Sequence, residues 1–371
     1  TKNGVEKMPK KKITKEKSIN RTKTSVELTI CLIALGTAGY VGYSCWKHAQ
    51  IVPETSDMAS DVSEIEIPDT SDVLDPNKII FTSAVVDTRS KFDGELILVN
   101  NDHEYYENEN ADLVSIMEMN DETDRHMFTA VDYTYKIRRS VYEPMAQMIE
   151  DFYEKYYNDT LIIYGSYRTK DFQEELYNNF INSSNDDSEE APIVAPAGFS
   201  EHETGYAFDF SETVNYDYQG DGDFQWLNEN CYKYGFIIRY TEDKKDITKY
   251  RSEPWHFRYV GVPHATYMTK QNICFEEYID LLKNNYEYSG EHLFVTDDDG
   301  KNYEIFYYAS DDGSDVTSVP VPSGYKYDIS GNNVDGFIVT VHTDEKVPFG
   351  QENPDSATTE PESETADEQE Y

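Results

Sequence analysis

The sequence predicts an α+β domain that follows an N-terminal transmembrane helix and precedes a small β-rich C-terminal appendage. Three observations lead to this prediction. Short apolar strands are mixed with three or four helices between about residues 91 and 288. A charge-free run of 19 residues lies near the N-terminus. From residue 289 to 346, short strands and turns follow one another without a helical pattern.

The N-terminal segment has the charge pattern of a membrane anchor. Residues 1–50 carry ten Lys and Arg against three Asp and Glu, and the apolar run Leu28–Trp46 lies within them. As a helix this run would span roughly 28 Å, enough to cross the hydrocarbon core of a bilayer. We therefore predict a basic cytoplasmic tail (1–25), an anchor (26–46) and an extracellular remainder. A cleaved signal peptide is the alternative, but no small-residue cleavage site follows the run.

The rest of the chain is strongly acidic. The sequence has 72 Asp and Glu against 32 Lys and Arg, a net charge of −40. Such a chain is repelled by nucleic acid, which excludes a DNA- or RNA-binding role. Residues 47–90 are rich in Asp, Ser and Thr and predict an extended acidic linker, and residues 347–371 predict a disordered acidic tail. No feature of the sequence indicates an obligate protein partner.

Apolar spacing predicts the elements of the globular part. Apolar residues recur at helical intervals in Arg139–Tyr157, which predicts a helix with one buried face. The other expected helices are Lys170–Phe180, Trp226–Tyr234 and Phe275–Asn285, and the expected strands are Leu96–Val99, Leu161–Tyr164, Phe236–Tyr240, Phe257–Val260, Glu304–Tyr308, Val316–Pro320, Tyr325–Ile329 and Phe337–Val341.

Two distant stretches carry the residue types of a catalytic metal site. Ser200–Asp209 contains His202 and Asp209, and Glu253–His256 adds a second histidine and a free carboxylate. Two imidazoles and one carboxylate can hold zinc with an open position, and a further carboxylate can take a proton from water. Asp209 lies between two phenylalanines, where a carboxylate is costly without a partner such as a cation. The spacing alone is weak support, since such pairs are common by chance.

The remaining histidines and cysteines have plainer interpretations. The other six histidines lack such local patterns and are expected to be surface or packing residues. Cys231 and Cys274 could pair if the domain is extracellular, or could be two buried free thiols.

The flanking residues resemble a known family. Four segments are similar to motifs of the VanY-type zinc D-alanyl-D-alanine carboxypeptidases (peptidase family M15, subfamily B): Ser200–Asp209 to SxHxxGxAxD, Tyr167-Arg168 with Gln173 to SGYRS…Q, Tyr234–Tyr240 to YGFILRYP, and Glu253–Gly261 to EPWHFRYVG. His264–Leu281 is similar to the family's closing helix. The resemblance covers roughly residues 91–285, and we place the zinc carboxypeptidase domain at 91–288.

The resemblance implies a fold and a set of roles. The fold is the DD-peptidase/hedgehog-like architecture with a central antiparallel sheet, which the mixture of strands and helices alone would not identify. Zn²⁺ is implied at His202, Asp209 and His256. Glu253 is implied as general base and acid, and Arg168 as the residue that stabilises the oxyanion. Gln173, Ser200 and Trp255 are the expected substrate contacts.

The chain departs from the family pattern at a few positions. Gly165-Ser166 stands where Ser-Gly is usual, and Lys249 replaces a common glycine. Cys231 and Cys274 stand where alanine and threonine are more usual. None of these changes removes an implied metal ligand.

The resulting hypothesis is a membrane-anchored, extracellular zinc D,D-carboxypeptidase that removes the terminal D-alanine from peptidoglycan stem peptides. One alternative is an L,D-carboxypeptidase acting on the tetrapeptide stem. Another is a catalytically silent cell-wall-binding module, against which the retention of Glu253 argues.

Overall fold

The computed structural model describes residues 79–183, 194–214 and 216–347, all within one compact unit that begins at Asp75. The predicted basic tail, the anchor, most of the acidic linker and the acidic C-terminal tail lie outside these residues. Within the described part of the chain, no helix is both long and apolar enough to cross a bilayer.

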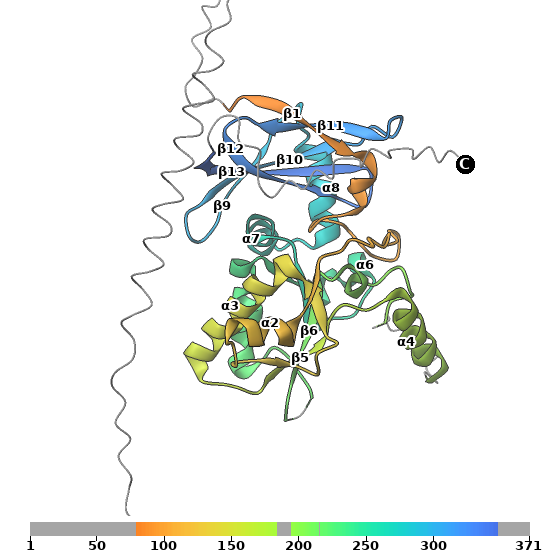
Figure 1. Cartoon of the computed structure of the whole chain (residues 1–371), viewed down its shortest axis with the longest axis vertical. Coiled ribbons are helices and arrows are strands. Elements are labelled where there is room, and N and C mark those ends of the chain that lie inside the picture. Colours follow the sequence, from red (N-terminus) through yellow and green to blue (C-terminus); the bar gives the residue numbers. More distant parts are fainter. Residues whose placement is uncertain (1–78, 184–193, 215, 348–371) are drawn as a thin grey trace, which may run out of the picture. The chain divides into compact units, whose positions relative to one another are not determined.

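A five-stranded sheet forms the centre of the lower part of Figure 1. Its strands are, in spatial order, β3 (Thr129–Ala130), β5 (Leu161–Gly165), β6 (Ala207–Glu212), β8 (Glu253–Tyr259) and β7 (Phe236–Tyr240). Only β3 and β5 are parallel, and the other neighbours are antiparallel. The predicted α+β class with a central sheet is confirmed, and the sheet is antiparallel as expected except for the β3–β5 pair.

One face of this sheet packs against α3 (Arg139–Tyr156). The apolar face of α3 and the aromatic side chains of β6 and β8, among them Phe208 and Phe257, belong to one buried cluster. Because successive side chains of a strand point to opposite faces, this packing directs Asp209 to the other face of the sheet. The helix predicted at Arg139–Tyr157 is confirmed.

The other face of the sheet meets α7 (Val262–Gln271) and α8 (Phe275–Asn285). Ile237 of β7 shares a second buried cluster with both helices and with Leu96 and Leu98. The strand predicted at Leu96–Val99 is wrong, although these residues are buried. Leu96 and Leu98 belong to the second cluster, and Ile97 and Val99 belong to the first. The segment therefore lies between two cores and pairs with no strand among the described residues.

The strands of the β-rich region come from chain segments before and after the sheet domain. A four-stranded sheet has the order β12 (Tyr325–Gly331), β13 (Gly336–Lys346), β10 (Asn302–Ala309) and β9 (Leu293–Thr296). Separately, β1 (Phe81–Asp87) pairs antiparallel with β11 (Val316–Pro322). The strands predicted after residue 300 are confirmed, and each is longer than expected. Residues 81–87 were predicted as linker, so the linker's expected end at residue 90 is wrong.

The β-rich region is continuous with the sheet domain. Leu293, Val295 and Ile305 belong to the same buried cluster as the residues of α7 and α8. Asn333 donates hydrogen bonds to the carbonyls of Leu98 and Glu104. The region therefore packs as part of one core and does not hang from the domain as a separate appendage.

The remaining elements are short, apart from α4. They are η1 (Thr88–Phe92), β2 (Leu113–Ser115), α2 (Ile116–Thr123), β4 (Lys136–Arg138), α4 (Lys170–Ser183), η2 (Glu201–Thr204), η3 (Gly222–Phe224), α5 (Gln225–Asn230), η4 (Cys231–Tyr234), η5 (Glu242–Lys244) and α6 (Lys245–Thr248). The predicted helix Trp226–Tyr234 is thus divided into α5 and η4, and it ends at Gly235 (φ 88°), as the sequence suggested.

Cys231 and Cys274 are both free and buried. Burial raises the pKa of each thiol to about 12, so neither is an activated nucleophile. The interpretation as two small packing residues holds in this structure.

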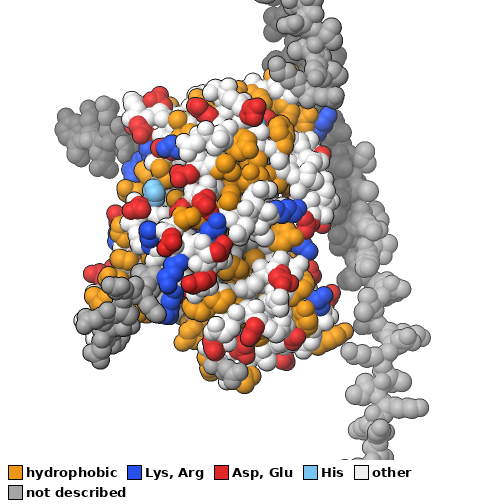
Figure 2. Space-filling view, turned by 180° about the vertical axis from the view of Figure 1, so that it is seen from behind, with side chains coloured by type: hydrophobic (Ala, Val, Ile, Leu, Met, Phe, Trp, Pro, Cys, Tyr) orange, Lys and Arg blue, Asp and Glu red, His pale blue; other side chains and the backbone are white. Residues whose placement is uncertain are grey.

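The acidic side chains are dispersed. On the face shown in Figure 2, Asp and Glu side chains lie scattered among Lys, Arg and apolar groups instead of forming one patch.

His264 of α7 joins three elements in the buried junction. Its ring nitrogens lie 2.7 Å from Tyr278 Oη in α8 and 3.0 Å from Thr340 Oγ1 in β13. Burial lowers the pKa of His264 from 6.5 to about 3, although Asp328 opposes this shift. The folded protein therefore favours the neutral ring, and protonation favours unfolding.

We expect the His264 contribution to stability to be complete above pH 6.5 and to be lost as the pH falls from 6.5 toward 3. Its slope is at most about 1.4 kcal/mol per pH unit. Urea unfolding of the chain and of its His264→Gln variant, between pH 7 and pH 4.5, measures this term, because glutamine can hydrogen-bond but does not titrate there. Equal pH slopes for the two proteins would contradict it.

Candidate metal and catalytic site

The register of the central sheet brings Asp209 and His256 together. On adjacent antiparallel strands, Asp209 of β6 lies directly opposite His256 of β8 and opposite Gly165 of β5. A Cβ atom at residue 165 would lie 2.2 Å from Asp209 Oδ2, so glycine leaves the room that the carboxylate occupies. The pair separated by 46 residues in the sequence is thus adjacent because of strand pairing.

His202 reaches the same place from the short helix η2, which precedes β6. Ser200 caps this helix, and Glu203 completes a capping box with the backbone of Ser200. Gly205 (φ 74°) ends η2 and turns the chain into β6. The ring of His202 is fixed by the 2.9 Å contact of Nδ1 with the carbonyl oxygen of Ser166. Nε2 is then directed toward Asp209.

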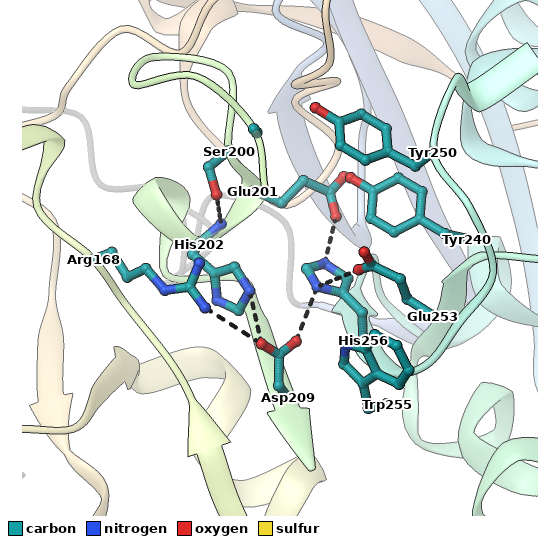
Figure 3. Close-up of a pocket in the computed structure, with 11 residues that line it drawn as sticks. Arg168, Ser200, Glu201, His202, Asp209, Tyr240, Tyr250, Glu253, Trp255 and His256 are labelled. Carbon is teal, nitrogen blue, oxygen red and sulfur yellow. Dashed lines mark hydrogen bonds and ion pairs between the residues drawn. The ribbon is translucent and has the colours of Figure 1, made fainter. Parts of the chain in front are cut away.

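The three residues converge on one point. His202 Nε2 lies 3.2 Å from Asp209 Oδ2, and His256 Nδ1 lies 3.0 Å from Asp209 Oδ1 (Figure 3). One ligand atom from each residue falls within 4.8 Å of the others. Asp209 Oδ1 is buried and accepts no hydrogen bond of good geometry from the described residues. Two imidazoles and one carboxylate, which has an unsatisfied buried oxygen, fit a zinc ion.

The protonation of these groups reflects their burial and mutual contacts. Burial lowers the pKa of His202 to about 4, with the Arg168 charge acting in the same direction. Burial opposes ionisation of Asp209, but His202 and His256 hold its pKa well below the usual range. Burial also disfavours a charged His256, yet Asp209 and Glu201 raise its pKa to about 9. A metal bound at His256 would therefore replace a proton.

Glu253 lies beside the convergence point with one free oxygen. The strand was expected at Phe257–Val260, but β8 (Glu253–Tyr259) begins earlier, and Glu253 is its first residue. Its Oε2 is 4.0 Å from His256 Nδ1, and its buried Oε1 has no hydrogen-bond partner among the described residues. Burial, reinforced by the charge of Asp209, raises the pKa of Glu253 to about 7. Such a carboxyl can both take and return a proton near neutral pH.

Arg168 follows β5 and points into the site. It donates from Nη2 to Asp209 Oδ2 (3.4 Å) and from Nη1 to Gln173 Oε1 (3.3 Å). Gln173 is fully buried, and its amide nitrogen donates to the carbonyl of Ala195 (2.8 Å). Gln173, an expected substrate contact, is not among the residues that line the cavity. It holds Arg168 and the Ala195 backbone instead.

A cavity of about 130 Å³ opens onto these groups. Ser200 and Trp255, both expected substrate contacts, line it together with the proposed ligands, Glu253 and Arg168. Four further lining residues were not singled out by the sequence: Ala195, Glu201, Tyr240 and Tyr250. Figure 3 shows the last three. Glu201 and Tyr240 lie inside motif segments quoted above, so the motifs contained the signal, but their chemistry alone did not mark them.

Known proteins match this chain in sequence and in fold. The family model described as VanY, D-alanyl-D-alanine carboxypeptidase, matches residues 134–262. A D-alanyl-D-alanine carboxypeptidase of Enterococcus faecium is 33% identical over 251 residues, which are 67% of this chain and 76% of that protein. The chain belongs to the VanY family of D-alanyl-D-alanine carboxypeptidases.

Two further matches agree with this assignment to the VanY family. The bifunctional D-Ala-D-Ala dipeptidase and carboxypeptidase VanXYC of Enterococcus gallinarum is 40% identical over 97 residues, 24% of this chain and 51% of that protein. The solved structure of the vancomycin resistance D,D-dipeptidase VanXYg, in complex with a D-Ala-D-Ala phosphinate analog, has a TM-score of 0.60 and 28% identity. It covers 71% of this chain and 99% of that chain. The protein is therefore an enzyme, a metallo-carboxypeptidase.

The departures from the VanY pattern have a local explanation. Ser166, in the inverted Gly165-Ser166 pair, still offers its backbone carbonyl to His202. Lys249 ends α6 in the left-handed conformation (φ 64°), which glycine adopts at the least cost. The lysine side chain is exposed and contacts only the carbonyl of Asp246 among the described groups.

We expect Lys249→Gly to stabilise the fold. A non-glycine residue in this conformation costs about 1–2 kcal/mol, and glycine loses about 0.5–1 kcal/mol of chain entropy, for a net gain of about 0.5–1 kcal/mol. Urea unfolding measures the change. Lys249→Ala is the matched control, because it removes the same side chain and keeps the strained backbone. A gain as large in the alanine variant would show that the backbone conformation is not the cause.

Proposed function

We propose that this chain is a zinc D,D-carboxypeptidase that removes the terminal D-alanine from peptidoglycan stem peptides. The observation that carries the proposal is the free, buried oxygen of Glu253 beside three converging ligand atoms. The activity of the family supports the reaction class, and the donor set of His202, Asp209 and His256 supports zinc.

Glu253 is the proposed proton carrier. A zinc ion held by the three ligands would supply Lewis acidity to a water molecule and to the scissile carbonyl. With a pKa of about 7, Glu253 can take the proton of the attacking water and later give it to the leaving amine of D-alanine. No other carboxylate that lines the cavity has a free oxygen, since Asp209 would hold the metal and both oxygens of Glu201 are engaged.

Arg168 and Ser200 are proposed to act on the substrate directly. The Arg168 guanidinium lies across Asp209 from His256 (Figure 3), where it can donate to the carbonyl oxygen as negative charge develops. Ser200 lines the cavity with a hydroxyl that caps η2 and still has a proton to donate to a carboxylate. Trp255 forms one apolar wall and also packs against the core under α3.

The location of the enzyme is part of the proposal. Its support is the sequence alone, namely the basic tail, the apolar run Leu28–Trp46 and the acidic segment that follows. These features favour a single-pass anchor with the carboxypeptidase domain outside the cell, where the stem peptides of the wall are accessible.

We expect the full chain to release D-alanine from a stem pentapeptide and to lose this activity with a zinc chelator. Glu253→Gln is expected to lower kcat by about 10²–10⁴-fold with zinc content unchanged, because the variant loses only the proton carrier. Glu242→Gln, at an exposed position outside the cavity, is the matched control and should keep full activity. A parallel loss of zinc in Glu253→Gln would make Glu253 a ligand.

The same assay separates the alternatives when a tetrapeptide stem is supplied beside the pentapeptide. The proposal expects release from the pentapeptide at a much higher kcat/KM. Release from the tetrapeptide alone would identify an L,D-carboxypeptidase. No chelator-sensitive release from either stem, despite bound zinc, would leave the silent cell-wall-binding module.

A further inference from the structure

A buried cluster of four charged side chains lies behind His256. The Glu201 side chain is fully buried, and its Oε1 accepts from Arg239 Nε (2.8 Å) and from Arg258 Nη1 (3.1 Å). Its other oxygen, Oε2, lies 3.3 Å from His256 Nε2. One carboxylate thus connects two buried guanidinium groups to a proposed metal ligand.

The two arginines are themselves held firmly. Arg239 forms a two-pronged ion pair with Glu276 of α8, with distances of 2.9 and 2.5 Å. Arg258 donates from Nη2 to the carbonyls of Glu95 (2.8 Å) and Ile97 (3.0 Å). Both guanidinium groups hold Glu201 Oε1, so that Oε2 faces His256.

Burying charged groups is expensive, and apolar packing of similar volume is often at least as stable. A cluster of two arginines and two glutamates is therefore a poor device for stability alone. Its members come from the segments Ser200–Asp209, Tyr234–Tyr240, Glu253–Gly261 and the closing helix, and the reaction proposed above uses none of them. A role at the site accounts for their placement.

The role follows from the hydrogen-bonding capacity of each group. An ionised carboxylate only accepts hydrogen bonds, and a neutral imidazole has one N–H and one bare nitrogen. Glu201 therefore requires a proton on His256 Nε2. The proton that a bound metal would replace is then the one on Nδ1, which lies 3.0 Å from Asp209 Oδ1. His202 is fixed in the opposite sense, because its Nδ1 faces the Ser166 carbonyl and Nε2 is left bare.

We propose that Glu201 is a positioning residue that holds His256 as the Nε2–H tautomer, with Arg239 and Arg258 fixing the carboxylate. Nδ1 of His256 is then the metal-binding atom. This inference rests on the proposed zinc site. It assigns Glu201 no contact with the reacting atoms, in contrast to Glu253, whose oxygen is free.

Glu201→Gln tests the inference, because glutamine has the shape of glutamate but can present an N–H donor to His256 Nε2 in place of an oxygen acceptor. The two guanidinium groups will draw the amide oxygen, so that the amide NH₂ faces His256 Nε2 and favours a proton on Nδ1. We expect zinc affinity, measured on the full chain by competition with a chromophoric chelator, to fall by about 10–100-fold. In ¹⁵N–¹H NMR spectra of the zinc-loaded chain, the His256 Nε2–H signal of the wild type should be lost or shifted in the variant.

Glu276→Gln is the matched control. Glu276 is the second carboxylate of the buried cluster and pairs with Arg239, as Glu201 does. It does not contact His256, so its replacement removes a buried charge without touching the proposed ligand. We expect it to lower stability while leaving zinc affinity and the His256 signal unchanged. Should Glu201→Gln fail to fold, Glu201→Asp replaces it, and it should still weaken zinc more than Glu276→Gln does.

The outcomes are distinct. Equal zinc affinity in the wild type and Glu201→Gln, or equal losses in Glu201→Gln and Glu276→Gln, would overturn the positioning role and leave the proposed function intact. A wild-type chain that takes up no zinc would overturn the proposed function and this inference with it.

Discussion

The alignment of three strands is the constraint on which the site depends. Gly165, Asp209 and His256 lie in one row across β5, β6 and β8. A slip of one residue in either pairing would turn a phenylalanine of the core toward the site and Asp209 or His256 toward α3. Since Phe208 and Phe257 pack under α3, the burial of aromatic side chains fixes the register, and the register fixes the ligands. The geometry of the proposed metal site is thus a consequence of core packing.

Polarity is divided between the two faces of the sheet. The face toward α3 is apolar, whereas the opposite face carries Asp209, His256 and Arg258. Charges on this face are buried, so each needs a partner of opposite sign or a metal. Glu201 and Glu276 balance Arg239 and Arg258, and Asp209 contacts Arg168 and both imidazoles. If Asp209 holds the metal, Glu253 is the one carboxylate among the described cavity residues that keeps a free oxygen, and this is the property expected of the group that moves protons.

Part of this arrangement could be predicted from the sequence. Helix α3 and strands β5 and β7 follow from local periodicity. The proposed ligands His202, Asp209 and His256 were implied by the family resemblance, and the structure brings them together. Prediction from the sequence failed where contacts between distant segments determine the secondary structure. Leu96–Val99 has the composition of a strand, but no neighbour pairs with it between the two cores. Residues 81–87 have the composition of a linker, and only their pairing with β11, more than 200 residues later in the chain, makes them a strand.

The same limit applies within the site. Gln173 was expected to contact substrate because it accompanies Arg168 in a motif, and this stays a prediction. A motif gives no side-chain direction, and in the structure the Gln173 amide contacts Arg168 and the Ala195 carbonyl outside the cavity lining. Glu201 was overlooked because its proposed role depends on its ion pairs with Arg239 of β7 and Arg258 of β8. Contacts between segments far apart in the sequence decide which oxygen is free and which is occupied.

X-ray absorption at the zinc edge on the metal-loaded full chain tests the central claim most directly. The account expects one zinc per chain, with nitrogen and oxygen neighbours only and the scattering pattern of two imidazole rings, reduced to one ring in His202→Ala. Sulfur neighbours, an unchanged pattern in that variant, or the absence of zinc would contradict a site built from His202, Asp209 and His256.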